Sequence, residues 1–186
     1  MRLSSFQNSG FSRGRSAVVE TIWLIVSAAL VSSFVPGSTH RRIILRWFGG
    51  SIGTGVVIKP GVKIKFPWKL IIGQDCWLGE GVWIDNVEPV VIGSNTCISQ
   101  GAYICTGNHD WSALDFSLVA REVTIGSSVW IGAKAIVGPG SHIEDGVVLG
   151  MGSVATGHFT PWNVFSGNPA AFKTTRKIAY DRDDAS

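Results

Sequence analysis

Histidine is the side chain in this sequence best suited to proton transfer or metal binding, because a neutral imidazole can do both near pH 7. Four histidines occur, among them His109 in TGNHDW, His142 in GSHIE and His158 in ATGHFT. No pair has the HxxxH or HxxxxH spacing, so the sequence predicts no metal site. His109 is the candidate for proton transfer.

The three cysteines are the other candidates for chemistry. Cys76, Cys97 and Cys105 form no CxxC pair and cannot all be bridged, which indicates a reducing compartment and a cytoplasmic location. Cys105 lies four residues before His109, so a covalent thiol mechanism is an alternative. No motif around Cys105 supports it.

Length and composition limit the fold and the partners. A chain of 186 residues with 45% hydrophobic and 16% charged residues fits one folded domain with tails. The net charge of +3 is uneven, since residues 1–50 hold six Arg and one Glu, and the remainder holds ten Lys/Arg against twelve Asp/Glu. The acidic balance of the main body argues against nucleic-acid binding.

A period of six residues runs through the chain from residue 52. A helix would need a period of about 3.6, so the pattern predicts short parallel strands stacked in a solenoid. The fifth position is small or β-branched and, like the first, is expected to point inward. The hexads start at Ile52, Ile58, Ile64, Ile72, Leu78, Ile84, Ile92, Ile98, Ile104, Ile125, Ile131, Val137, Ile143, Leu149 and Ala155.

This repeat resembles that of the hexapeptide acyltransferases. The segments IKPGVKIKFPW, CWLGEGVWIDNVEPVVIGSNTCISQGAYICTGNHDW, VWIGAKAIVGPG and SGNPAAF are most similar to the colanic-acid type exopolysaccharide O-acetyltransferases, relatives of the galactoside, maltose and nodulation-factor acetyltransferases. The resemblance implies an all-β fold: a left-handed parallel β-helix with three hexads per coil. Fifteen hexads then make about five coils, with an N-terminal helix and a short C-terminal segment.

Three hexads per coil place every irregularity of the repeat at one corner. Two extra residues follow the hexad of Ile64, two follow that of Ile84, and fifteen follow that of Ile104. Insertions confined to one corner of a solenoid usually mark its binding face. We therefore expect an N-terminal arm at 1–50, a β-helix domain at 51–165 with a loop at 110–124, and a C-terminal segment at 166–186.

The resemblance also implies the activity and the site. It predicts transfer of an acetyl group from acetyl-CoA to a sugar hydroxyl in exopolysaccharide biosynthesis, with His109 as general base and no metal, in a homotrimer whose sites are shared between subunits. Asp85 or Asn86, with Asn108, would bind the saccharide acceptor. The residues expected to bind acetyl-CoA are Trp130, Ala133, Met151, Thr156, Gly157, Lys173 and Arg176.

Two other classes of function stay open at this point. A non-catalytic β-solenoid scaffold would show regular exposed ladders, whereas this chain has irregular polar positions and one long loop that carries a histidine. A metalloenzyme like the γ-type carbonic anhydrases shares the expected fold, but it needs a close histidine pair and a third histidine.

The N-terminal arm contains the most apolar stretch, AVVETIWLIVSAALVSSFVP at 17–36. Glu20 lies inside it, its uncharged run of 15 residues is shorter than a membrane span of about 18, and no AxA-like cleavage site follows. The segment is expected to be a helix that either covers the hydrophobic core or lies on the inner face of the membrane. His40, Arg41, Arg42 and Arg46 could hold it near anionic lipid.

Overall fold

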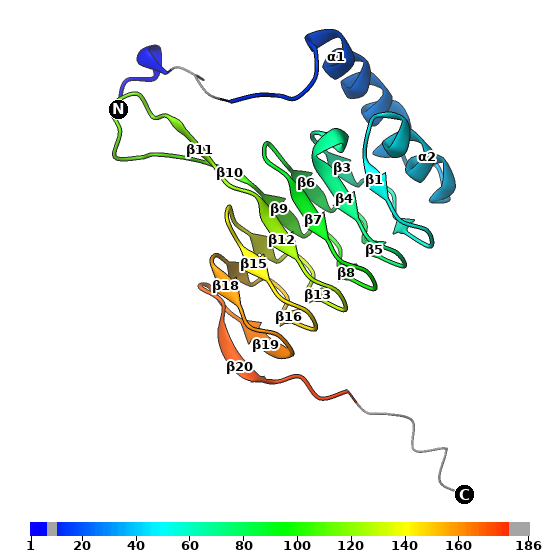
Figure 1. Cartoon of the computed structure of the whole chain (residues 1–186), viewed down its shortest axis with the longest axis vertical. Coiled ribbons are helices and arrows are strands. Elements are labelled where there is room, and N and C mark those ends of the chain that lie inside the picture. The colour runs from blue at the N-terminus through cyan, green and yellow to red at the C-terminus, as the bar shows by residue number, and fades with distance from the viewer. Residues whose placement is uncertain (7–10, 179–186) are drawn as a thin grey trace, which may run out of the picture.

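The computed structural model describes residues 1–6 and 11–178, which form a three-sided parallel β-solenoid capped by helices at its N-terminal end (Figure 1). Sheet A consists of β1 (Ser51–Ile52), β4 (Leu70–Ile72), β7 (Val90–Ile92), β12 (Val123–Ile125), β15 (His142–Ile143) and β18 (His158–Phe159). Sheet B consists of β2 (Val57–Ile58), β5 (Trp77–Leu78), β8 (Cys97–Ile98), β13 (Trp130–Ile131), β16 (Val148–Leu149), β19 (Asn163–Ser166) and β20 (Ala171–Thr175). Sheet C consists of β3 (Lys63–Ile64), β6 (Trp83–Asp85), β9 (Tyr103–Cys105), β14 (Ile136–Val137) and β17 (Val154–Ala155).

Each coil contributes one strand to each sheet in the order A, B, C, and the corners are named A–B, B–C and C–A accordingly. Five coils are complete, and a sixth has strands in sheets A and B. The predicted fold class is confirmed, but about five coils was an underestimate. The sixth coil was missed because Phe159 follows Ala155 by four residues, which breaks the period of six.

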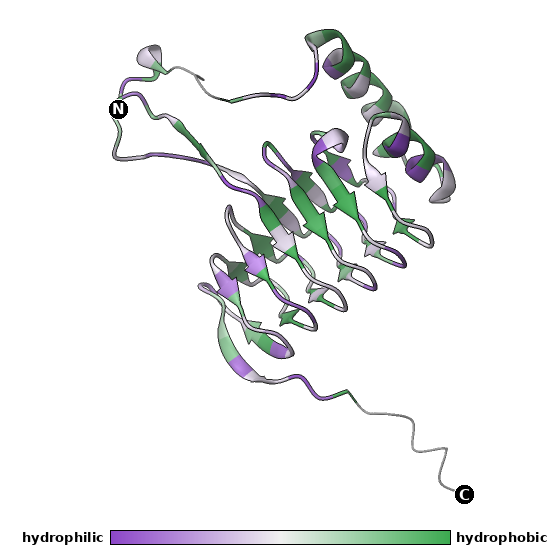
Figure 2. Cartoon of the chain, viewed as in Figure 1, coloured by the Kyte–Doolittle hydropathy of each residue, from purple (hydrophilic) through white to green (hydrophobic). Residues whose placement is uncertain are grey.

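The core is an aliphatic ladder inside the solenoid. The first position of each hexad is buried in every coil, as are the small residues at the fifth position, such as Val56, Cys76 and Ala102. Figure 2 shows hydrophobic residues along most strands, in green, with hydrophilic segments, in purple, on β15 and β18 and at several corners. Each coil is too thin to bury its own side chains, so stacking on the next coil supplies the core.

The turns at the corners explain part of the glycine content. The fourth hexad position has a left-handed backbone, with φ of +69° at Gly55, +67° at Gly81 and +70° at Gly146. At the second position the limit is space, because a Cβ on Gly53 would lie 2.4 Å from the carbonyl oxygen of Gly73 in the next coil. Glycine there allows the coils to stack at hydrogen-bonding distance.

Helices close the N-terminal end of the solenoid. They are α1 (Ala17–Val26), the π-helical turn η2 (Ser27–Val31) and α2 (Thr39–Trp47). The first coil has no preceding coil to donate N–H hydrogen bonds to its carbonyl groups, and an unpaired buried carbonyl group is costly. The arm supplies the donors: Trp23 to Ile64 and Lys65, Ser32 to Val62, Ser38 to Ile58, Arg42 to Val56, and Arg46 to Ile52 and Gly53.

Three of the four residues of the basic cluster, Arg41, Arg42 and Arg46, donate hydrogen bonds to backbone carbonyl groups of this chain. Arg41 is fully buried, and its guanidinium donates hydrogen bonds to the carbonyl groups of Val31, Ser33, Val35 and Gly37. Burial lowers the pKa of Arg41. The second helix, α2, was not predicted. No helix within the described residues is long and apolar enough to cross a bilayer.

The C–A corner carries all the insertions, as the spacing predicted. After β3 the corner holds the 3-10 helix η3 (Pro67–Lys69), and after β9 it holds an antiparallel hairpin of β10 (Gly107–His109) and β11 (Leu118–Ala120). Figure 1 shows this hairpin projecting from the side of the solenoid toward the N-terminal residues. The expectation of a loop at 110–124 is thus corrected: 110–117 forms the hairpin tip, and Leu118–Ala120 and Val123–Ile125 are strands.

The C-terminal segment closes the other end. β20 turns back to pair antiparallel with β19, so the solenoid extends beyond the predicted domain end at residue 165. The predicted segment 166–186 is therefore partly strand. Its last residues, 179–186, lie outside the described part of the chain.

Candidate active site

The hairpin holds His109 in a fixed backbone position beside the solenoid. His109 is the last residue of β10 and lies opposite Leu118 of β11. Asn108 is exposed, and its side-chain oxygen accepts a hydrogen bond from the backbone N–H of His109 at 2.8 Å. At the tip, the Asp110 carboxylate accepts hydrogen bonds from Ser112, which lower the pKa of Asp110. These local bonds shape the tip without a hydrophobic core.

The ring of His109 is oriented by the tip of its own hairpin. Its Nδ1 lies 2.8 Å from the backbone oxygen of Phe116. The imidazole also stacks on the Phe116 ring, with ring centroids 4.3 Å apart and an interplanar angle of 3°. A carbonyl oxygen can only accept, so Nδ1 carries the proton in this contact. In the neutral ring, Nε2 then carries the lone pair and can accept a proton.

A cavity of about 350 Å³ lies beside His109, where the hairpin, the arm and the C–A corner meet. Its lining includes the ion pair of Arg13 and Glu20, whose charged groups lie 2.9 Å apart. It also includes Lys65, which forms an ion pair with Asp85. The Phe6 ring is 5.7 Å from the His109 ring. The lining residues are Phe6, Phe11, Arg13, Glu20, Lys65, Phe66, Val87, His109 and Leu118.

Asp85 is presented toward this region by side chains that the sequence did not single out. Its Oδ1 lies 2.9 Å from Lys65 Nζ, and its Oδ2 accepts a hydrogen bond of 2.9 Å from the Tyr103 hydroxyl. Burial and the hydrogen bonds to Cys105 and Asp85 raise the pKa of Tyr103, so its hydroxyl stays protonated and donates. The signal in the sequence was the spacing, because Lys65, Asp85 and Tyr103 stand on successive coils of sheet C.

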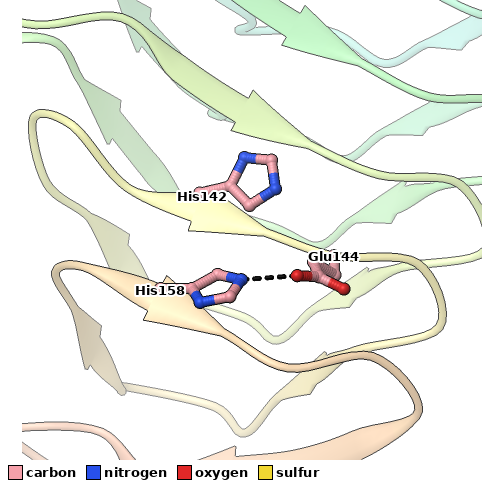
Figure 3. Close-up of side chains that lie close together, drawn as sticks. All are labelled: His142, Glu144 and His158. Carbon is pink, nitrogen blue, oxygen red and sulfur yellow. Dashed lines mark hydrogen bonds and ion pairs between the residues drawn. The ribbon is translucent and has the colours of Figure 1, made fainter.

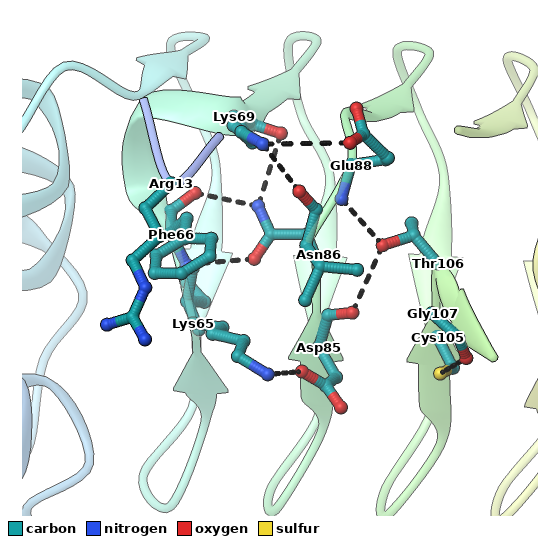
Figure 4. A network of polar contacts seen from close by, with 12 residues as sticks. Arg13, Lys65, Phe66, Lys69, Asp85, Asn86, Glu88, Cys105, Thr106 and Gly107 are labelled. Carbon is teal, nitrogen blue, oxygen red and sulfur yellow. Dashed lines mark hydrogen bonds and ion pairs between the residues drawn. The ribbon is translucent and has the colours of Figure 1, made fainter. Parts of the chain in front are cut away.

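Asn86 has a different environment from its neighbour. It is fully buried, its amide oxygen accepts from the backbone N–H of Phe66, and its amide nitrogen donates to the carbonyl groups of Phe66 and Lys69 (Figure 4). These bonds hold the η3 turn against β6. The sequence left open whether Asp85 or Asn86 contacts the acceptor, and this geometry favours Asp85.

The residues expected to bind acetyl-CoA are distributed over the solenoid. Thr156 and Gly157 follow β17 at the C–A corner, the corner that carries the hairpin. Ala133 and Met151 lie at the B–C corner, where the Gly152 N–H donates to the Ala133 carbonyl. Trp130 faces outward on sheet B, and its Nε1 donates to Ser99. The structure therefore does not bring these residues to one place on one chain.

The two basic candidates lie near the C-terminal end. Lys173 is exposed on β20. The guanidinium of Arg176 donates to the carbonyl groups of Ser128 and Gly146 at the A–B corner and lies over the Trp162 ring, 5.8 Å from its centroid. These contacts give Arg176 a role in anchoring the segment after β20.

The thiol alternative gains nothing from the structure. The Cys105 thiol donates a hydrogen bond to the carbonyl group of Gly107 at 3.0 Å. Burial raises the pKa of the Cys76 and Cys97 thiols.

His142 and His158 lie close together, although no HxxxH or HxxxxH spacing relates them in the sequence. They occupy directly paired positions on β15 and β18, with ring centroids 5.3 Å apart, and Glu144 lies beside them (Figure 3). Spacing rules for one strand or helix missed the pair because its members stand on neighbouring coils.

Two sequence models of hexapeptide repeats match this chain. The model described as "Bacterial transferase hexapeptide (six repeats)" matches residues 122–157, and that of the "Hexapeptide repeat of succinyl-transferase" matches residues 69–105. Such repeats wind a left-handed β-helix, which agrees with the predicted fold class.

Curated proteins match over most of the chain. The colanic acid biosynthesis acetyltransferase WcaF of Escherichia coli K12 is 37% identical over 169 residues, which cover 87% of this chain and 92% of that protein. The galactoside O-acetyltransferase of the same organism is 27% identical over 146 residues, covering 77% and 70%. Among solved structures, the hexapeptide-repeat acetyltransferase VCA0836 of Vibrio cholerae, in complex with acetyl coenzyme A, has a TM-score of 0.79 at 19% identity, covering 94% and 97%. At 19% identity, the similarity to VCA0836 shows a shared fold only.

The contrast between Asn86 and Asp85 gives a stability prediction. Asn86→Ala removes the partner of the Phe66 N–H, the bond to the Lys69 carbonyl group and one of two bonds to the Phe66 carbonyl group. The free energy of unfolding should therefore fall by about 3 kcal/mol. Asp85→Asn keeps the shape and an acceptor for Tyr103, and should cost less than about 1 kcal/mol. Urea denaturation followed by circular dichroism measures both variants. Equal losses would contradict the distinction between the two residues.

Proposed function

We propose that this chain, a member of the hexapeptide-repeat acetyltransferases, transfers an acetyl group from acetyl-CoA to a saccharide hydroxyl. The saccharide is one used in exopolysaccharide synthesis. Family membership rests on the match to WcaF over most of both chains. The acceptor class is supported by the names of two relatives, one of colanic acid biosynthesis and one acting on galactosides. A scaffold without activity does not fit this family.

The orientation of the His109 ring is the observation that supports His109 as the general base. Because Nδ1–H is directed at the Phe116 carbonyl, the free lone pair of the neutral ring is on Nε2. A base held in one orientation by a backbone group can take a proton repeatedly without rearranging between cycles. Proton transfer by Nε2 of His109 does not require a second titrating side chain.

The reaction then proceeds as direct transfer within one complex of both substrates. Nε2 of His109 takes the proton of the acceptor hydroxyl as its oxygen forms a bond to the thioester carbonyl carbon. The tetrahedral intermediate collapses with loss of the CoA sulfur, which receives the proton from the imidazolium. Atoms and charges balance without an enzyme thiol or a metal ion.

The cavity beside His109 has the chemistry expected of an acceptor site. Phe6 and Phe11 provide flat apolar surface for the faces of a sugar ring. The charged groups of Arg13, Glu20 and Lys65 can bond its hydroxyl groups. Asp85, held by Lys65 and Tyr103, is proposed as the carboxylate at the edge of this site.

The acetyl-CoA residues argue for a site shared between chains. Thr156 and Gly157 lie at the C–A corner, whereas Ala133 and Met151 lie across sheet C at the B–C corner. A single solenoid cannot turn both corners toward one ligand beside His109. A closed ring of three copies would bring different corners of neighbouring chains together, so a homotrimer is proposed.

Contact with an anionic lipid surface is also proposed, through the outer face of α1. Val18, Ile22 and Ile25 lie on one side of the helix, are 48–68% exposed, and are bordered by Trp47 and Arg15. An apolar helix face with a tryptophan and an arginine at its margin suits the interface of a bilayer. Such contact would bring the site to a lipid-linked acceptor at the inner face of the membrane.

His109→Ala should lower the rate of acetyl transfer by roughly 10²–10⁴, the usual contribution of a positioned base. Cys105→Ala is the matched control and should keep the rate. The assay follows CoA release with galactoside and glucoside oligosaccharides and verifies the acetylated product by mass spectrometry. Near wild-type turnover by His109→Ala, or an acetylated Cys105, would refute the mechanism.

Light scattering of the purified full chain should give the mass of a trimer. Because the proposed site needs two chains, mixtures of His109→Ala with Met151→Asp subunits should regain activity that each variant lacks alone. An active monomer, or mixtures that stay inactive after subunit exchange, would exclude a shared site.

Sedimentation with phosphatidylglycerol vesicles tests the lipid contact. The full chain should bind these more tightly than phosphatidylcholine vesicles, and the double change Val18→Asp, Ile25→Asp should weaken binding about tenfold or more. Ile71→Asp, which places a charge on the outer face of sheet A, is the control. Binding that survives the double change would argue that another surface is used.

A further inference from the structure

A group of three side chains with metal-binding atoms lies on the outer face of sheet A, and the proposed reaction does not use it. His142 stands on β15, His158 stands beside it on β18, and Glu144 follows His142 by two residues on the same face (Figure 3). We propose that His142, Glu144 and His158 bind one divalent transition metal ion of the zinc type.

The donor atoms are close enough to share an ion. One ligand atom from each side chain lies within 4.8 Å of the other two. Zinc bound to nitrogen and carboxylate oxygen at about 2.0–2.2 Å in a tetrahedron separates its ligands by roughly 3.4 Å. Glu144 Oε1 and His158 Nε2 are 2.5 Å apart, so the ion would enter by opening this contact by about 1 Å. Both side chains are partly exposed and can make that movement.

The backbone under these ligands is fixed by the coil ladder. The His142 N–H donates to Gly157 O, and the Glu144 N–H donates to Phe159 O, on either side of His158. The three Cα positions are therefore set before any ion binds. Preorganised ligands lose little conformational entropy on binding.

A second group orients His142. The hydroxyl of Thr124, on the preceding coil, lies 2.5 Å from His142 Nδ1. When Nδ1–H donates to this oxygen, Nε2 carries the lone pair for a metal. Histidine ligands in proteins commonly have such a partner on the other nitrogen, and its loss typically weakens binding by about 10–100-fold.

The nearest alternative is a plain ion pair between His158 and Glu144. That pair would need neither His142 beside it nor Thr124 behind His142. A cavity of about 500 Å³ adjoins the group, lined in part by Thr124, His142, Glu144 and Trp162, and it can hold the water that completes a tetrahedral site with three protein ligands. The ligand set comes from two coils, so a bound ion would link the fifth coil to the sixth.

Equilibrium dialysis of the full, tag-free chain against Zn²⁺, after removal of metals with a chelator, tests the proposal. We expect one saturable ion per chain, and visible absorption bands of tetrahedral Co²⁺ when cobalt replaces zinc. His142→Ala and Glu144→Gln should each weaken zinc binding at least about tenfold, and Thr124→Val should weaken it about tenfold. A zinc-dependent rise in the melting temperature should disappear in the same variants.

His109→Ala removes a histidine elsewhere and should leave zinc stoichiometry at one. Circular dichroism shows whether each variant is folded, and Thr124→Val, which leaves all three ligands in place, serves if a ligand variant is not. Absence of saturable binding by the wild-type chain would overturn the proposal. Full affinity in His142→Ala would also overturn it and leave the ion pair as the explanation. Zinc binding does not depend on acetyl transfer, so this result is separate from the proposed function.

Discussion

The structure depends on a backbone ladder in which every coil is the hydrogen-bonding partner of the next. Strands of two or three residues have no stability of their own, and the aliphatic residues inside each coil are covered by neighbouring coils. Both ends of such a ladder present unpaired groups. The arm closes one end with indole, hydroxyl and guanidinium donors, and β20 closes the other by reversing direction.

The same ladder decides where a site can be built. A residue inserted within a strand would displace the stack, whereas the C–A corner accepts η3 and the β10–β11 hairpin without disturbing the register of its neighbours. The hairpin carries His109 out of the ladder and supplies the Phe116 carbonyl that orients its ring. Below it, Asn86 fixes the corner and leaves Asp85 available to Lys65 and Tyr103. At this corner Asn86 thus stabilises the fold, whereas the adjacent Asp85 is the residue proposed to bind the acceptor.

The period of six was sufficient to predict the strands and their inward positions, because each depends on local spacing. The three hexads per coil that the family resemblance implied then placed the insertions at one corner. What the sequence did not reveal depends on contacts between coils. Asp85 and Tyr103 meet because β6 and β9 pair on adjacent coils, where Asp85 lies opposite Cys105 and Tyr103 lies opposite Trp83. His142 and His158 meet at a separation of sixteen because the fifth C–A corner is two residues short. Arg41 looked like a surface charge, and its burial depends on the path of residues 31–37 around it.

The helical cap precedes the solenoid in the sequence, and this order bears on how the protein is made. The arm and the first coil are joined by hydrogen bonds from Trp23 to residues 64 and 65, so this unit can form once residue 65 has left the ribosome. Each later coil then meets a finished strand edge on which to pair. A solenoid capped first at its C-terminus would have to wait for the whole chain. Here assembly can keep pace with translation, and the apolar interior is covered coil by coil as it emerges.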